Sequence, residues 1–247
     1  MRIFEDLHLV ASGQFAISHR CDCHVYLVDC GGELCLVDAG VGLNDERLLG
    51  NIRAAGYEPS DIGHILVTHA HSDHAGGCRG LAEATGARVV CSEPEAKLMA
   101  EGSDDELGLI LAKHSGCYPD DYAYPHHMPD KIVADGEELS IGHVEITCLV
   151  LPGHSVASVC YLFDSLYAGR VLFSGDTVLF RGLIGMLNCP GSDINAYRQT
   201  IFRLAEVEFD ALMPGHLVFV CDGGMEHVRM AKEALSGVFM PRCMGQP

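Results

Sequence analysis

The feature that most constrains the fold is a repeated pairing of a short apolar run with metal-ligand side chains. Ile65-Leu66-Val67 leads into Thr68-His69-Ala70-His71-Ser72-Asp73-His74, a string of the form H-x-H-x-D-H. Three later apolar runs lead into single ligands, each directly after a glycine: His154, Asp176 and His216. Short apolar runs of this kind predict buried strands. Strand ends that meet at one rim would bring five imidazoles and two carboxylates together.

The dense first string is hard to explain as packing. Three histidines and an aspartate fall within six positions, and each would need its own hydrogen-bond partner if it were buried. Neutral nitrogens and anionic oxygens suit a borderline-soft divalent metal, and seven ligands suit two ions better than one. The sequence therefore predicts two divalent ions, zinc first, with iron or manganese as alternatives.

These motifs resemble those of the metallo-β-lactamase superfamily. The H-x-H-x-D-H string, the P-G-H at His154, the S-G-D-T at Asp176 and the P-G-H at His216 occur in the family's order. Leu36-Val37-Asp38-Ala39-Gly40 resembles its early strand-end aspartate motif, so the resemblance runs from about residue 20 to about residue 220. It is closest to the glyoxalase II-like hydrolases, which also place Asp where Asp176 stands. β-Lactamases of the commonest subclass carry Cys there, so antibiotic hydrolysis is not favoured.

The resemblance implies a role for each ligand. One metal would be bound by His69, His71 and His154, and the second by Asp73, His74 and His216, with Asp176 bridging the two. Two metals about 3.5–4 Å apart can share a hydroxide that acts as the nucleophile. Asp73 or Asp176 would steer its proton. Asp38 ends a strand and is expected to orient a ligand imidazole, with a turn-forming role before Gly40 as the alternative.

The implied fold is α+β, a four-layer αββα sandwich with two packed mixed sheets, in a single domain over residues 1–247. The sequence pattern agrees with it. Gly31-Gly32 predicts a hairpin turn between strands 25–30 and 33–37, and further strands are expected near 138–151, 157–163 and 170–175. Helices are expected over 44–55, 77–84, 93–100, 193–205 and 224–236. Ser92 has capping-box spacing with Glu95, and Ser192 is the expected cap of its helix.

Two segments would border the substrate. Residues 102–130 are the least regular part of the chain, and they form either a lid over the active site or a solvated connection. Residues 180–191 follow the Asp176 motif and contain Arg181 and Asn188 as candidate substrate contacts. Arg181 would receive a substrate carboxylate, or it is a solvent-facing charge. The stretch with which glyoxalase II enzymes bind glutathione is not present here, so a glutathione thioester is not favoured.

Composition narrows the class of protein. The formal net charge of −18 argues against nucleic-acid binding, which needs lysines and arginines on phosphates. No apolar run reaches 18 residues and no signal peptide is evident, so a cytoplasmic protein without a membrane span is expected. The twelve cysteines are expected to be mostly buried thiols. Cys21, Cys23 and His24 form either a weak second metal site or part of the active-site rim.

Three functions compete. The first is a dinuclear metal-dependent hydrolase of a small thioester, lactone or related carbonyl substrate. The second is a mononuclear iron persulfide dioxygenase-like oxidoreductase that uses His69, His154 and Asp176. The third is a binding module that keeps only the fold, which the complete ligand set disfavours. Nothing in the sequence indicates an oligomeric state.

Overall fold

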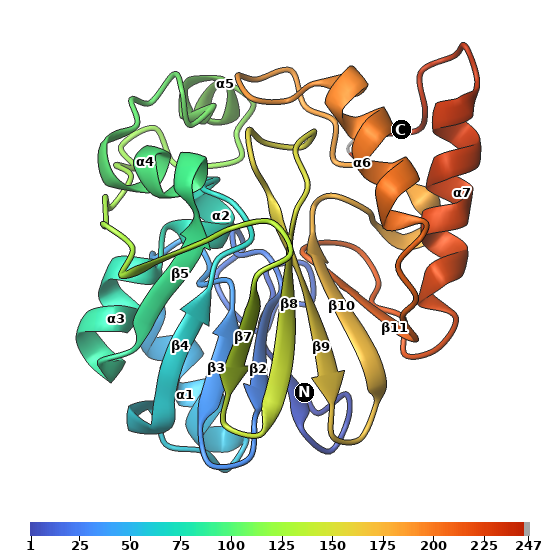
Figure 1. Cartoon of the computed structure of the whole chain (residues 1–247). Helices are drawn as coiled ribbons and strands as arrows, with labels where there is room; N and C mark the ends of the chain where they lie inside the picture. The colour runs from blue at the N-terminus through green and yellow to red at the C-terminus, as the bar shows by residue number, and fades with distance from the viewer. Residues whose placement is uncertain (245–247) are drawn as a thin grey trace.

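A computed structural model describes residues 1–244 and contains two sheets packed face to face (Figure 1). The first sheet has the order β1-β2-β3-β4-β5-β6. Its first three strands pair antiparallel and the remaining pairs are parallel. The strands are β1 (Leu7–Ala11), β2 (Val25–Asp29), β3 (Leu34–Val37), β4 (Ile62–Leu66), β5 (Arg88–Ser92) and β6 (Lys131–Val133).

The second sheet has the order β11-β10-β9-β8-β7. Strands β7 to β10 pair antiparallel with their neighbours, and β11 lies parallel to β10. These strands are β7 (Glu138–Ile141), β8 (Val144–Val150), β9 (Val159–Ser165), β10 (Gly169–Gly175) and β11 (Ala211–Pro214). Both sheets are therefore mixed.

Helices cover the outer face of each sheet (Figure 1). The first sheet carries α1 (Asp45–Ala54), α3 (Cys78–Thr85) and α4 (Glu93–Glu101), and the second carries α6 (Ile194–Leu204) and α7 (Gly224–Ser236). The short elements are α2 (Ser72–Ala75), α5 (Leu109–His114) and the 3-10 turns η1 (Pro59–Asp61) and η2 (Phe180–Gly182). The predicted four-layer α+β sandwich is confirmed.

Strand β2 shows why a continuous apolar run is needed. Val25 and Leu27 join the core under the outer helices, whereas Tyr26 and Val28 join the core between the sheets. A strand buried on both faces has no polar position to alternate with its apolar ones. A third core, between the second sheet and helices α6 and α7, includes Leu172 and Ile201.

The predicted hairpin and the five helices are confirmed, but two caps differ. The N-cap of α6 is Asp193 rather than Ser192, because Oδ1 of Asp193 accepts from Asn195 N at 2.6 Å and Ala196 N at 3.1 Å. Ser92 is the N-cap of α4, but its hydroxyl donates to the Ala157 carbonyl at 2.7 Å instead of capping the helix. A tertiary partner has replaced the local one.

No helix in residues 1–244 is both long and apolar enough to cross a membrane. The single-domain prediction for 1–247 stays a prediction, and residues 245–247 lie outside the described part of the chain.

Candidate metal centre

Strand direction brings the ligands to one edge. In the second sheet β8 and β10 are each antiparallel to β9, and β11 is parallel to β10. The loops that follow β8, β10 and β11 therefore leave from the same edge, and they carry His154, Asp176 and His216. In the first sheet β3 and β4 are parallel, so the loops with Asp38 and with His69 also start at a common edge.

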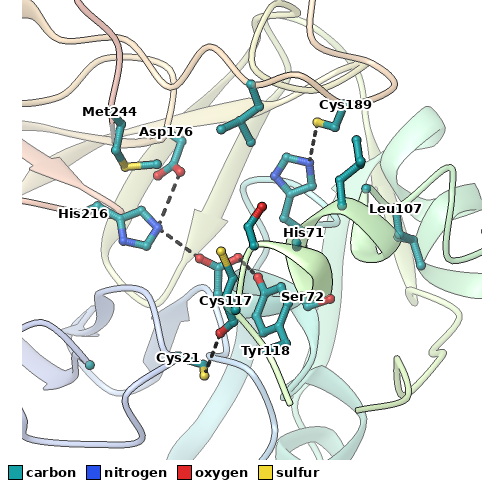
Figure 2. Close-up of a pocket in the computed structure, with 18 of the residues that line it drawn as sticks. Cys21, His71, Ser72, Leu107, Cys117, Tyr118, Asp176, Cys189, His216 and Met244 are labelled. Atoms are coloured by element: carbon teal, nitrogen blue, oxygen red, sulfur yellow. Dashed lines mark hydrogen bonds and ion pairs between the residues drawn. The ribbon is translucent and has the colours of Figure 1, made fainter. Parts of the chain in front are cut away.

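A cavity of about 660 Å³ opens at this edge (Figure 2). His71, Asp73, Asp176 and His216 line it together with residues from the loop between β1 and β2, the 107–118 segment, the 187–189 loop and Met244. The volume lies in the range of small-molecule sites.

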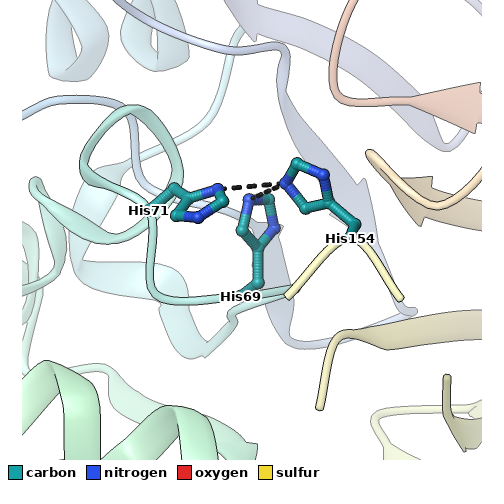
Figure 3. Close-up of side chains that lie close together, drawn as sticks. All are labelled: His69, His71 and His154. Carbon is teal, nitrogen blue, oxygen red and sulfur yellow. Dashed lines mark hydrogen bonds between the residues drawn. The ribbon is translucent and has the colours of Figure 1, made fainter. Parts of the chain in front are cut away.

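His69, His71 and His154 form the first group of metal donors (Figure 3). His154 Nε2 lies 2.9 Å from His69 Nε2 and 3.0 Å from His71 Nδ1. His154 Nδ1–H donates to the Gly185 carbonyl at 2.5 Å, which leaves its Nε2 lone pair directed at the other two rings. Three nitrogen lone pairs thus converge on one point.

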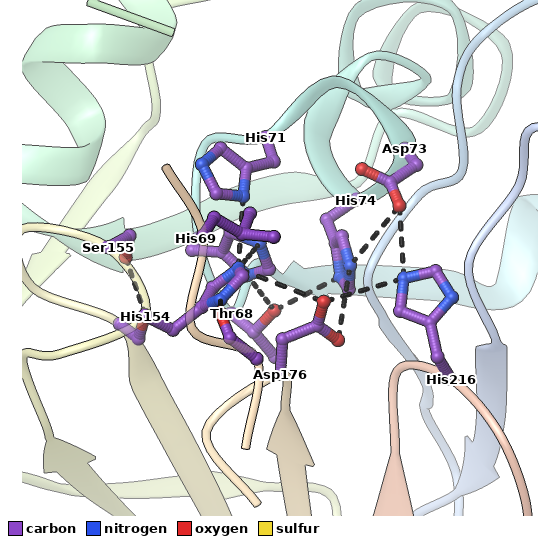
Figure 4. A network of polar contacts seen from close by, with 12 residues as sticks. Thr68, His69, His71, Asp73, His74, His154, Ser155, Asp176 and His216 are labelled. Carbon is purple, nitrogen blue, oxygen red and sulfur yellow. Dashed lines mark hydrogen bonds and ion pairs between the residues drawn. The ribbon is translucent and has the colours of Figure 1, made fainter. Parts of the chain in front are cut away.

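Asp73, His74 and His216 form the second group of donors (Figure 4). Asp73 Oδ2 lies 3.0 Å from His216 Nε2 and 3.7 Å from His74 Nε2. Asp176 lies between the two groups, with its carboxylate oxygens 3.5 Å from His216 Nε2, 3.6 Å from His74 Nε2 and 3.8 Å from His154 Nε2.

Asp38 fixes the orientation of two imidazoles. Its Oδ2 accepts from His74 Nδ1–H at 2.8 Å, and its carboxylate accepts from the Thr68 hydroxyl at 3.0 Å. The same hydroxyl accepts from His69 Nδ1–H at 3.0 Å. The outward nitrogens of His69 and His74 are therefore protonated, and their Nε2 atoms are free for a metal. Asp38 adopts a φ of 64°, a region that Asp tolerates better than most residues.

The donor atoms fit metal ions. Within residues 1–244, His74 Nε2 and Asp176 Oδ1 are buried without a hydrogen-bond partner, an arrangement that a cation would satisfy. Burial, with the neighbouring imidazoles, lowers the pKa of His71 to about 3 and holds the pKa of His69 well below its ordinary value. Burial alone would raise the pKa of Asp73, but the imidazoles of His74 and His216 outweigh it, so the net pKa is lowered. His69 and His71 thus present neutral nitrogens and Asp73 an anionic oxygen. Burial alone would lower the pKa of His216, but the carboxylates of Asp176 and Asp73 outweigh it and raise that pKa, so a cation in the second group would replace a proton.

Gly215 precedes His216 for a steric reason. A Cβ at Gly215 would lie 2.5 Å from His74 Cε1 and 2.6 Å from Asp176 Oδ1. Any larger residue would displace the His74 and Asp176 side chains. The glycine before this ligand is thus part of the site's geometry.

Glu95 is a residue that the sequence analysis did not assign to the site. It is fully buried, and its carboxylate accepts from Ala70 N at 2.8 Å, Ala157 N at 2.9 Å and the Ser155 hydroxyl at 2.6 Å. Ala70 lies between His69 and His71, and Ser155 follows His154. Glu95 therefore joins the two loops that carry the first donor group. Burial raises its pKa, although these hydrogen bonds oppose the shift.

Tyr118 is a second residue that the sequence did not reveal. It lines the cavity, and its hydroxyl donates to Asp73 Oδ1 at 2.8 Å. The ring stacks on Tyr122 at 5.4 Å, and the Tyr122 hydroxyl donates to the Val41 carbonyl. Tyr118 thus fixes one oxygen of Asp73 while the other faces the second donor group.

The two predicted substrate contacts are placed differently. Asn188 lines the cavity. Arg181 is exposed and does not line it, because its guanidinium lies over the Phe180 ring, 5.6 Å from the centroid. Residues from the 102–130 segment form one wall of the cavity, and whether that segment moves as a lid stays a prediction.

The cysteines divide by environment. Eight cysteines are buried: Cys23, Cys30, Cys35, Cys78, Cys91, Cys148, Cys160 and Cys243. Burial raises the pKa of Cys160 to about 12, which keeps that thiol protonated. Cys21, Cys117 and Cys189 line the cavity instead. Of the two interpretations of Cys21, Cys23 and His24, the metal site is not supported, because these residues do not form a donor group in the described chain. The His24 ring contacts the Leu217 carbonyl and stacks on Phe15, and Cys21 lies at the cavity, as the rim interpretation expects.

A sequence model described as "Metallo-beta-lactamase superfamily" matches residues 20–216. The chain belongs to this superfamily. Among solved structures, it is similar to a metallo-β-lactamase with a HARLDQ motif from Cronobacter sakazakii, with a TM-score of 0.74 and 20% identity over 96% of this chain and 92% of that one. A subclass B3 enzyme of Bradyrhizobium japonicum gives 0.72 and 23%, covering 96% and 90%. These two likenesses show the shared fold.

Two superfamily relatives have names that state an activity. An acyl-coenzyme A thioesterase of Gallus gallus is 29% identical over 81% of this chain and 74% of its own length. A hydroxyacylglutathione hydrolase of a Polaromonas species is 30% identical over 77% of this chain but only 60% of its own length. The superfamily match, these two relatives named for hydrolytic activities and a cluster of His and Asp side chains that could hold metal ions together identify the chain as a metal-dependent hydrolase of this superfamily.

Proposed function

We propose that the protein is a dinuclear hydrolase of a small thioester, or of a related ester or lactone, with zinc as its native metal. The observation that carries the proposal is the pair of donor groups with Asp176 between them, both opening on one cavity. His69, His71 and His154 would hold one ion. Asp73, His74 and His216 would hold the other, and Asp176 would bridge them.

Two divalent ions supply Lewis acidity, which lowers the pKa of a water molecule and polarises a carbonyl group. The chain's own groups orient the donors. Asp38 and the Gly185 carbonyl accept hydrogen bonds from the outward nitrogens of His74 and His154, and Tyr118 directs Asp73 Oδ2 inward. In hydrolysis the water oxygen bonds to the acyl carbon and the C–S bond breaks. One water proton reaches the leaving thiolate, and the other leaves the product acid as it ionises.

Thioester chemistry is supported by two observations. The acyl-coenzyme A thioesterase and the hydroxyacylglutathione hydrolase are both named as enzymes that act on acyl compounds. The cavity of about 660 Å³ has room for a small acyl group beside the donors.

Free buried thiols fit a reducing compartment, so we propose a cytoplasmic location. The acidic net charge supports a small-molecule substrate over a nucleic acid.

The mononuclear iron alternative uses His69, His154 and Asp176, which also lie close together. In that alternative Asp73, His74 and His216 would bind no metal. The buried and unpartnered His74 Nε2 and the 3.0 Å approach of Asp73 to His216 favour a second ion.

Elemental analysis per chain tests the proposal. Protein from a metal-balanced medium should carry close to two zinc or manganese ions. Asp73→Ala should keep about one ion and lose thioester hydrolysis. Close to one iron per chain, with oxygen consumption on a persulfide, would overturn the hydrolase in favour of the oxygenase. Unchanged turnover in Asp73→Ala would overturn the two-metal mechanism.

A further inference from the structure

Arg20 is the one lysine or arginine among the residues that line the cavity in the described chain. Its side chain is exposed and forms no ion pair within residues 1–244. The nearest acid in sequence, Asp22, is already engaged, because its oxygens accept from His19 N at 2.8 Å and Val41 N at 2.9 Å. The guanidinium is therefore available to a ligand.

An apolar wall forms another part of the same cavity. Leu107, Leu111 and Leu187 line it together with Met244. Leu111 lies in α5, and Leu107 precedes that helix by two residues. The Leu111 side chain is 43% exposed. In Figure 2, Leu107 and Cys189 lie on the side of His71, whereas Cys21, the neighbour of Arg20, lies beside Cys117. Asp176 and His216 lie on the opposite side of the same view from Leu107.

We propose that the substrate is an amphipathic thioester. Its apolar acyl group packs on Leu107, Leu111 and Leu187, and its leaving thiol carries an oxyanion that Arg20 binds. The inference rests on the proposed hydrolase function and adds the chemical class of the substrate.

The positive charge of Arg20 matters for substrate binding because the chain as a whole is strongly acidic. The chain has a formal net charge of −18, and such a field repels an anionic substrate. An unpaired guanidinium at the cavity can hold a phosphate or a carboxylate in two parallel hydrogen bonds, which a lysine cannot reproduce. Arg20 therefore replaces Arg181 as the candidate anion contact, because Arg181 does not line the cavity.

The anion contact is tested with three octanoyl thioesters that differ in the thiol. Coenzyme A carries phosphates, glutathione carries carboxylates, and pantetheine carries neither. We expect kcat/KM for at least one anionic thioester to exceed that for the pantetheine thioester by about tenfold, as for a charge-assisted hydrogen bond. Arg20→Ala should remove this preference through KM, and Arg20→Lys should restore part of it. The better anionic substrate identifies the oxyanion.

The acyl contact is tested with butyryl and octanoyl groups on the same thiol. Leu111→Ala should reduce the preference for octanoyl by about fivefold, the order of the apolar area lost. Ile110→Ala is the matched control, because Ile110 is also exposed on α5 but does not line the cavity.

The outcomes separate the two levels of the proposal. If no thioester or ester is hydrolysed by the metal-loaded enzyme, the proposed function fails. If thioesters are hydrolysed with no preference for an anion, or if Arg181→Ala abolishes that preference while Arg20→Ala keeps it, the assignment of Arg20 fails. If Leu111→Ala and Ile110→Ala show the same preference for octanoyl over butyryl thioesters, the proposed acyl contact at Leu111 fails.

Discussion

At the scale of single residues, Tyr118 should tune the second metal. Its hydroxyl holds Asp73 Oδ1 at 2.8 Å, so Tyr118→Phe frees that carboxylate to rotate. Loss of a hydrogen bond to a ligand weakens metal binding by about tenfold or more. We expect the second ion to be lost at a lower chelator concentration while the first is unaffected, as measured by competition titration.

Tyr122→Phe is the control for this prediction. Tyr122 stacks on the same ring but donates to the Val41 carbonyl and not to a ligand. Equal metal affinity in both variants would show that Tyr118 acts only through packing.

Glu95 should position the first donor group, because its carboxylate accepts hydrogen bonds from the backbone of the two loops that carry His69, His71 and His154. Glu95→Ala leaves the buried Ala70 N and Ala157 N without their acceptor, whereas the Ser155 hydroxyl keeps Ser158 Oγ as a partner. Unsatisfied buried groups cost about 1–3 kcal/mol each, so the free energy of unfolding should fall by about 3 kcal/mol or more in urea denaturation. Glu93→Ala, on the same helix but exposed, should change it little. A similar small effect in both variants would contradict this role.

Tyr118 and Glu95 are residues of the candidate site that could not be predicted from the sequence. The seven candidate ligands could be selected from the sequence because they follow apolar runs at fixed local spacing; their role as ligands stays a prediction. Tyr118 and Glu95 meet the site only through tertiary contacts 45 and 25 residues away in sequence. Their neighbours give no local signal, and Glu95 looked like half of a capping box. Arg181 was proposed from its nearness to Asp176 in sequence, but the chain turns at Arg181, where φ is 61°, and carries the side chain away from the cavity.

At the scale of elements, strands and helices were predicted better than their ends. Apolar runs such as that of β2 and the 3.6-residue period of α6 are properties of whole segments, so they survive any tertiary arrangement. A cap depends on which of two adjacent polar residues reaches the free N–H groups, and Asp193 did so instead of Ser192. Helix boundaries are fixed by single hydrogen bonds.

Asp45, the first residue of helix α1, should lower the free energy of unfolding in a pH-dependent way. Burial, with Asp22 and Glu46 nearby, raises the pKa of Asp45 to about 6. An acid whose pKa is raised by folding disfavours the folded state once it ionises. The cost is absent below the unfolded pKa of about 4 and is complete above pH 6. Asp45→Asn should therefore match the parent near pH 3.5 and gain in Tm relative to it between pH 4 and 7.

Thermal unfolding at several pH values checks this prediction. Glu46→Gln is the comparison: Glu46 lies exposed in the same first turn and is the smallest of the three named causes, so this variant should show a smaller gain in Tm over the same pH range. A difference in Tm between Asp45→Asn and the parent that does not change with pH would contradict the assigned cause.

At the scale of the whole molecule, the donors connect the two halves of the sandwich. His69, His71, Asp73 and His74 follow β4 of the first sheet, whereas His154, Asp176 and His216 follow strands of the second. Each proposed ion therefore takes ligands from both sheets. A metal that binds only the folded state stabilises it by about 2.7 kcal/mol at a free concentration of 100 Kd.

Metal removal should consequently lower the stability of the whole fold and not only its activity. For a chain of this size each kcal/mol shifts Tm by about 2–4 °C, so complete chelation should lower Tm by about 5–10 °C. Asp73→Ala, which keeps one ion, should lie between the loaded and the stripped protein and respond less to chelator. If chelation abolished hydrolysis while Tm stayed constant, the ions would not link the sheets, and the fold would depend on the apolar core between them alone.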